Sequence, residues 1–75
     1  MSSRHSHPLS IAVGKRIRNL RLKKGWSQTD LAVHLDLSRT HISDLECGMR
    51  EVCLITLQVI ARGLGTTMAK LLRGL

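Results

Sequence analysis

The chain has 75 residues, a formal charge of +7, and a single Trp with no Phe or Tyr. This length fits one small domain near the lower limit for a self-sufficient hydrophobic core, and it excludes a deep catalytic cleft between domains. The core must therefore come from Leu, Ile and Val, and a chain this small often gains stability by binding a second copy of itself.

The charge is unevenly distributed along the chain. Residues 1–26 hold seven Lys or Arg and no acid, whereas residues 27–46 hold one Arg against four acids. A basic region beside a nearly neutral one is typical of a protein that grips a polyanion from one side. The alternative is a basic surface that serves only solubility.

Several features favour a cytoplasmic protein without a metal, a cofactor or a membrane partner. No apolar run approaches the ~20 residues of a membrane span, and the N-terminus lacks the apolar stretch of a secretory signal. Cys47 and Cys53 are too few for a disulfide framework and lack the C-x-x-C spacing of a zinc site. Residues 1–8, rich in Ser and His, have the composition of a flexible tail, which leaves residues 9–75 as the folded domain.

The first predicted helix has Ser10 as its N-cap and runs to about Lys24, where Gly25 ends it. At about 100° per residue one face of this helix is apolar, and Arg21 lies at the border of that face. Arg21 is therefore partly buried, and a buried charge needs a partner. The apolar face consists of Val13, Gly14, Ile17 and Leu20.

A second helix begins after Ser27, the N-cap, and has Asp30 in its first turn, where the helix dipole favours an acid. This helix is short because residues 36–38 supply a turn and a new N-cap. The third helix then runs from Arg39 to about Glu46 and is closed by Gly48. The apolar face of the second helix consists of Leu31, Ala32 and Leu35.

Two further helices complete the chain, which shows no strand-like alternation and no internal repeat. The segment "LITLQVIARGLG" predicts a fourth helix, and "TTMAKLLRGL" predicts a short fifth. We therefore expect an all-α, compact domain of five helices. The inward-facing residues of these two helices are expected to be Leu54, Leu57, Ile60, Ala61, Leu64, Met68, Leu71 and Leu72.

The second and third helices, joined by a short turn, form a helix-turn-helix, whose second helix can enter the DNA major groove. The face of the third helix that is turned away from the core carries side chains that can read bases. Arg39 can bond guanine through two contacts, and Thr40 or Ser43 can touch a base edge or a phosphate. Asp44 can accept a hydrogen bond from cytosine or repel wrong partners. An ordinary solvated helix face is the alternative.

Two long segments, "WSQTDLAVHLDLSRTHISDLECGMR" and "LITLQVIARGLGTTMAKLL", contain most of the chain's distinctive motifs. They resemble the phage repressor and Cro-type helix-turn-helix family, from about Gly14 to Leu72. In size the chain is similar to stand-alone regulators such as restriction–modification controller proteins. The resemblance implies a five-helix, repressor-like fold and a transcriptional regulator that binds double-stranded DNA at a palindromic operator as a homodimer.

The resemblance also implies roles for individual residues. Ser38, Arg39, Thr40 and Asp44 match positions that approach DNA. Arg21 and Glu46 match a pair that forms an ion bridge in this family, which agrees with the partner that the helical pattern requires for Arg21. The residues expected to contact phosphate are Gln28, Ser38, His41, Arg50 and Arg21.

The chain departs from the family pattern at three places. Asp36 stands where a turn Gly is usual, so the turn is expected either to be strained or to be adjusted by the Asp side chain, which tolerates left-handed geometry. Val52 and Cys53 replace a common Pro-Ser cap, which predicts a weak start for the fourth helix. Ile55 and Val59 occupy positions that are more often polar in the family.

Ile55 and Val59 form an apolar i, i+4 pair about 160° and 200° from Leu57, on the face turned away from the core. An adjacent exposed apolar pair on a small domain predicts a partner surface. We expect a two-fold dimer interface centred on this pair and the start of the fifth helix, and widened by Leu75, which sets two recognition helices about 34 Å apart. The alternative is that both residues pack under the N-terminal tail or the 49–53 loop.

An enzyme is not expected, because the chain has no phosphate-binding Gly-rich loop, no Cys/His ligand spacing and no carboxylate pair beside a pocket. A small-molecule ligand is not expected either, since no pocket-forming domain is present. The main alternative to a DNA-binding regulator is an antitoxin-like or other interaction module whose main partner is a second protein. Such modules usually extend a binding arm beyond the fold, and only three residues follow Leu72.

Overall fold

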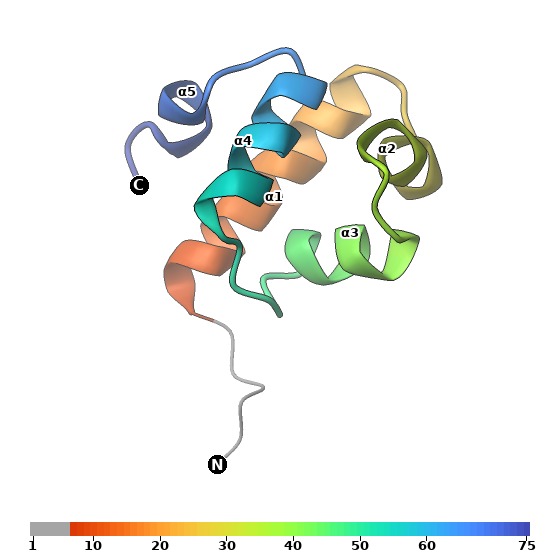
Figure 1. Ribbon diagram of the computed structural model, residues 1–75. Coiled ribbons are helices and arrows are strands. Elements are labelled where there is room, and N and C mark those ends of the chain that lie inside the picture. Colours follow the sequence, from red (N-terminus) through yellow and green to blue (C-terminus); the bar gives the residue numbers. More distant parts are fainter. Residues whose placement is uncertain (1–6) are drawn as a thin grey trace.

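The computed structural model describes residues 7–75, which form five helices and no strand. The helices are α1 (Pro8–Lys23), α2 (Gln28–Leu35), α3 (Arg39–Glu46), α4 (Leu54–Gly63) and α5 (Met68–Leu72). Helix α1 runs through the middle of the molecule, with α2 and α3 on one side and α5 on the other (Figure 1). The predicted all-α, five-helix architecture is confirmed. Of the tail predicted for residues 1–8, residues 1–6 lie outside the described part of the chain.

Helix α1 begins two residues before the predicted cap. His7 is the N-cap, and its Nδ1 accepts a hydrogen bond from the Leu9 amide at 3.1 Å. Pro8 follows as the first helical residue, where its fixed φ and missing N–H are favourable. The prediction of Ser10 as N-cap was wrong because this proline starts the helix earlier, and the predicted tail does not extend to residue 8.

The two caps of the helix-turn-helix form as predicted. The Ser27 hydroxyl accepts from the Asp30 amide at 3.0 Å while the Asp30 carboxylate accepts from the Ser27 amide at 2.8 Å. The Ser38 hydroxyl accepts from the His41 amide at 3.0 Å. Between them Asp36 adopts the expected left-handed conformation, with φ 58° and ψ 42°. These local contacts fix the length and direction of the turn between α2 and α3.

The core is aliphatic and draws on all five helices. Leu54 was expected to face this core and instead is 73% exposed. It is the first residue of α4 and stands at the rim of a groove between α1, α4 and α5, so no element covers it. The buried apolar residues are Val13, Ile17, Leu31, Ala32, Leu35, Ile42, Leu45, Leu57, Ile60, Ala61, Leu64 and Leu71.

Gly14 lets α1 and α3 approach closely. A Cβ at this position would collide with the backbone carbonyl oxygens of Leu45 and Glu46. Any larger residue would therefore push the end of α3 away from α1. The close approach sets the distance between the two side chains that join these helices, Arg21 and Glu46.

Candidate nucleic-acid interface

Helix α3 is buried along one face and open to solvent along the other. Ile42 and Leu45 are 0% and 3% exposed, whereas Arg39 and Thr40 lie in solvent. His41, Ser43 and Asp44 are partly exposed. Ser38, at the start of the helix, uses its oxygen as the cap acceptor, which leaves its hydroxyl proton free to be donated. The side chains predicted to read bases therefore share one accessible face.

The far end of α3 is anchored by a buried polar network. Arg21 Nε donates to Glu46 Oε2 at 2.6 Å and Arg21 Nη2 donates to Glu46 Oε1 at 2.9 Å, a bidentate ion pair. Gln28 Nε2, on α2, donates to Glu46 Oε1 at 3.2 Å. The structure thus contains the predicted Arg21–Glu46 pair, and it shows that Gln28 joins the pair to α2.

Arg21 is wholly occupied within the fold. Its remaining donor group, Nη1, bonds the Trp26 carbonyl oxygen at 2.7 Å, and the residue is only 5% exposed. The hydrogen bond to Glu46 raises the pKa of Arg21 against the opposing effect of burial, so its charge is permanent. The phosphate contact predicted for Arg21 stays a prediction that this burial disfavours, because each nitrogen of its guanidinium already donates a hydrogen bond within the fold.

Asp44 and Arg50 contact each other. Arg50 Nη2 lies 3.3 Å from Asp44 Oδ2, and the two side chains are 46% and 39% exposed. Sequence reasoning treated Asp44 as a base reader and Arg50 as a phosphate contact, with no link between them. The structure brings the two together at the surface, next to the polar face of α3.

The basic residues of α1 divide into structural and exposed ones. Arg16 Nη1 donates to the Leu71 and Lys70 carbonyl oxygens at 3.2 and 3.5 Å, which binds α1 to the last turn of α5. Lys15 and Arg18 are exposed and border a hollow of about 530 Å³ beside the end of α3. The role of Arg16 was missed because the two helices are far apart in sequence.

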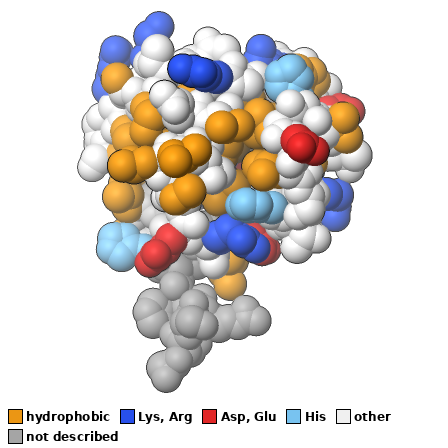
Figure 2. Space-filling model, viewed as in Figure 1, with side chains coloured by type: hydrophobic (Ala, Val, Ile, Leu, Met, Phe, Trp, Pro, Cys, Tyr) orange, Lys and Arg blue, Asp and Glu red, His pale blue; other side chains and the backbone are white. Residues whose placement is uncertain are grey.

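The molecule also presents an apolar surface, formed by Leu54, Ile55 and Val59 on α4. These residues are 73%, 74% and 40% exposed, and Figure 2 shows hydrophobic side chains gathered over α4 and towards α5. Leu75, at the C-terminus, is 48% exposed. Because Ile55 is 74% exposed, the described residues of the 49–53 loop do not cover it. The alternative in which Ile55 packs under that loop therefore does not occur.

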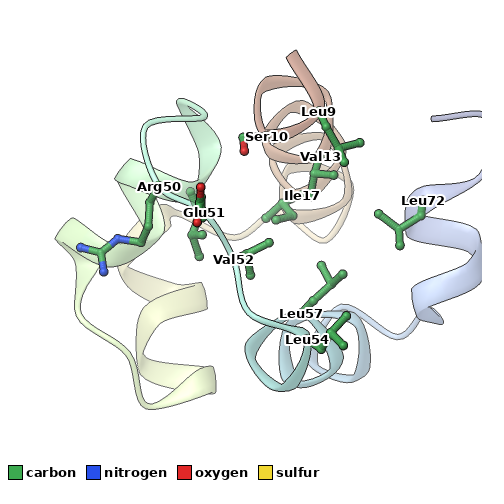
Figure 3. Close-up of a pocket in the computed structure, with 11 residues that line it drawn as sticks. Leu9, Ser10, Val13, Ile17, Arg50, Glu51, Val52, Leu54, Leu57 and Leu72 are labelled. Carbon is green, nitrogen blue, oxygen red and sulfur yellow. The ribbon is translucent and has the colours of Figure 1, made fainter. Parts of the chain in front are cut away.

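A groove of about 360 Å³ opens beside Leu54. It is lined by apolar side chains from α1, α4 and α5, among them Val13, Leu57 and Leu72, while Arg50 points away from it (Figure 3). This volume lies in the range of small-molecule pockets, about 300–1,000 Å³. The expectation that no small molecule binds therefore stays a prediction.

In the described part of the chain, no helix has the length and apolar character needed to cross a membrane.

Comparison with known proteins agrees with this architecture. The family model described as helix-turn-helix matches residues 17–71. The chain belongs to this family of DNA-binding transcriptional regulators. The resemblance predicted from the motifs is thus confirmed.

Two relatives are control proteins of similar length. Control protein C.MunI from a Mycoplasma species is 39% identical over 64 residues, which cover 84% of this chain and 86% of the relative. Control protein C.BamHI from Bacillus amyloliquefaciens is 40% identical over 65 residues, covering 85% and 80%. The similarity to restriction–modification controller proteins expected from the sequence is therefore confirmed.

A similar solved structure is that of the restriction–modification controller protein C.Esp1396I, a tetramer in complex with its natural 35-base-pair operator. Its TM-score with this chain is 0.80, at 33% sequence identity, and the match covers 88% of this chain and 87% of the other. The fold described above is therefore the same as that of a regulator seen on its DNA.

Proposed function

We propose that the protein binds a palindromic operator in double-stranded DNA as a homodimer, with α3 in the major groove, and regulates transcription there. The observation that carries this proposal is the exposed polar face of α3, held in place by the buried Arg21–Glu46 pair. A recognition helix needs accessible hydrogen-bond donors, and the rest of the fold must hold it rigidly in position. A DNA partner also favours a cytoplasmic location.

In this proposal base reading and phosphate binding fall to different residues. Arg39 is the leading base reader because its exposed guanidinium can bond guanine twice, with Thr40, Ser43 and Asp44 beside it. The contacts to the DNA backbone fix register and supply salt-dependent affinity, which suits a chain of charge +7. The proposed phosphate contacts are Gln28, Ser38, His41 and Arg50.

The proposed dimer uses the apolar surface of α4. Ile55 and Val59 are both accessible, and Leu54 adds a third large side chain that sequence reasoning had assigned to the core. A two-fold contact between such surfaces is self-complementary and would pair two recognition helices on one face of the duplex. The operator-bound tetramer of C.Esp1396I supports assembly of copies on DNA.

Selection of bound sites from random duplex DNA, followed by binding measurements at fixed salt, tests the proposal. Arg39→Ala should cost about 1–3 kcal/mol on the selected site and relax preference at one base position. Arg62→Ala removes an exposed arginine at the end of α4 and is the matched control for charge. Equal losses of Arg39→Ala on selected and random DNA would remove its role as a base reader.

The alternative, an interaction module for a second protein, gives a different outcome. Such a protein would purify with a second polypeptide and would show no preferred duplex when tested alone. The exposed apolar surface of α4 would then be occupied by that polypeptide. Preferential binding of one duplex by the isolated chain decides for the operator-binding function.

A further inference from the structure

The contact between Asp44 and Arg50 joins two residues that the proposed function sends to different parts of the DNA. Asp44 stands on the polar face of α3, and Arg50 belongs to the loop between α3 and α4. Their Oδ2 and Nη2 atoms, 3.3 Å apart, are engaged with each other. Arg50 points away from the apolar groove, so its charged end lies free of the core (Figure 3).

The loop that carries Arg50 has a fixed backbone. Gly48 has a φ of +72° and is buried, and a Cβ there would stand 2.7 Å from the Ile11 Cα atom of α1. The Met49 amide donates to the carbonyl oxygen of Asp44 at 2.9 Å, which ties the loop to α3. Arg50 can therefore leave Asp44 by side-chain rotation, without rearrangement of the loop.

The physical character of the pair suits exchange. An ion pair between half-exposed side chains is weak, so a DNA phosphate can compete for the arginine. A carboxylate left alone among phosphates is repelled, and an acceptor facing a base edge without a donor loses a hydrogen bond. Separation of Asp44 and Arg50 is therefore favourable only where the DNA offers Asp44 a donor of its own.

Resting on the proposed function, we propose that Asp44 and Arg50 act together as a specificity-determining pair. On non-cognate DNA the two side chains stay paired, and Arg50 neutralises Asp44. On the operator, Asp44 accepts a hydrogen bond from the exocyclic amino group of a cytosine, and Arg50 turns to a phosphate oxygen. Recognition of one base thereby adds one backbone contact, and a wrong base costs both.

The salt dependence of binding tests this directly, because each neutralised phosphate contributes about 0.9 to the slope of log K against log salt concentration. Arg50→Gln should reduce the magnitude of this negative slope on the selected operator by about 0.9 for each protomer, and it should leave the slope on random duplex unchanged. Asp44→Asn frees Arg50 on any DNA, so it should increase the magnitude of the slope on random duplex by about 0.9 for each protomer.

Affinity provides the second readout. Asp44→Asn should weaken binding to the selected operator about tenfold, since an amide is a poorer acceptor for the cytosine amino group, and should tighten binding to random duplex. Arg62→Gln is the matched control and should leave the salt-dependence slopes on the selected operator and on random duplex unchanged. Thermal unfolding of each variant checks the fold, which two half-exposed side chains should leave intact.

Two results would overturn the pair. An equal fall in both slopes for Arg50→Gln would mean that Arg50 binds phosphate on any DNA, independently of Asp44. Unchanged slopes for Asp44→Asn would mean that the carboxylate does not restrain Arg50. Failure of the unaltered protein to prefer any duplex is a different outcome, because it would remove the proposed function itself.

Discussion

The segment from α1 to the loop after α3 and the segment formed by α4 and α5 differ in the polar side-chain contacts that hold them. Both side-chain ion pairs within the described residues lie in the first segment, between residues 21 and 50, and α2 and α3 there start with side-chain caps. In the second segment the Thr67 side chain caps α5, but Cys53, the N-cap of α4, makes no side-chain cap hydrogen bond, and Leu54 and Ile55 are exposed. The first segment is thus specified internally, whereas the second leaves apolar surface that a partner can complete.

This difference suits the two tasks proposed for the two segments. A base-reading helix must be held rigidly, because small displacements of its side chains abolish bidentate contacts. Directional bonds such as those among Arg21, Glu46 and Gln28 provide that rigidity. An association surface needs area more than direction, and in the proposed dimer three large aliphatic side chains on one helix would supply it.

The largest effect is expected from removal of the anchor of the first segment. Glu46→Ala leaves the Arg21 guanidinium buried without its counter-charge, which should lower the free energy of unfolding by about 3–5 kcal/mol. The double variant Arg21→Met/Glu46→Leu removes both charges and should recover much of that loss. Chemical denaturation of the two variants measures both values, and purely additive single-site effects would show that the pair is uncoupled.

Next in size is the disruption of the apolar surface. Ile55→Glu/Val59→Lys should convert a dimer at micromolar concentration into a monomer, because charged side chains would be buried at the contact. Sedimentation reports the change, and the melting curve confirms that the exposed positions leave the fold intact. Val33→Glu is the matched control, since Val33 is 76% exposed on α2. A folded variant that still sediments as a dimer would move the interface elsewhere.

Sequence reasoning was most accurate where structure is local. The caps at Ser27 and Ser38 follow from short-range hydrogen bonding and were predicted at the right residues, and the left-handed Asp36 is one of the two outcomes expected from the turn Gly that the family resemblance places there. The Arg21–Glu46 pair was predicted because a charge on an apolar helical face needs a partner and the family resemblance supplied one.

Features that depend on the relative position of distant segments were not predictable in the same way. The bond from Arg16 to the end of α5 and the exposure of Leu54 both follow from how α1, α4 and α5 pack together. The Asp44–Arg50 contact requires the path of the loop after Gly48. The early start of α1 was missed for a more local reason, because the imidazole of His7 caps the helix in place of the hydroxyl that was expected. The DNA contacts and the dimer interface stay predictions.

A third test would give α4 the kind of start that α2 and α3 possess. Cys53 is the N-cap of α4 and makes no side-chain cap bond, while its thiol contacts the Thr56 hydroxyl at 3.1 Å. Cys53→Ser should supply a stronger acceptor than the thiol for the backbone amides of the first turn and raise Tm by about 3–6 °C. Cys53→Ala, which removes the thiol without adding a cap, should give no such rise. A Tm of Cys53→Ser at or below that of Cys53→Ala would show that the start of α4 is not limited by its cap.

The smallest effect concerns pH and the capping box of α2. Hydrogen bonds from Ser27 lower the pKa of Asp30 below its ordinary value of 3.8. Since the folded pKa is the lower one, this contribution to stability is fully present above pH 3.8 and is lost as pH falls through the folded pKa. Asp30→Asn lacks the titrating group, so the difference in Tm between the unaltered protein and this variant should be constant near neutral pH and should shrink in acid. Thermal unfolding followed by circular dichroism over this range measures the difference. If it stayed constant well below pH 3.8, the capping carboxylate would not be the group responsible, and the start of α2 would depend on the Ser27 hydroxyl alone.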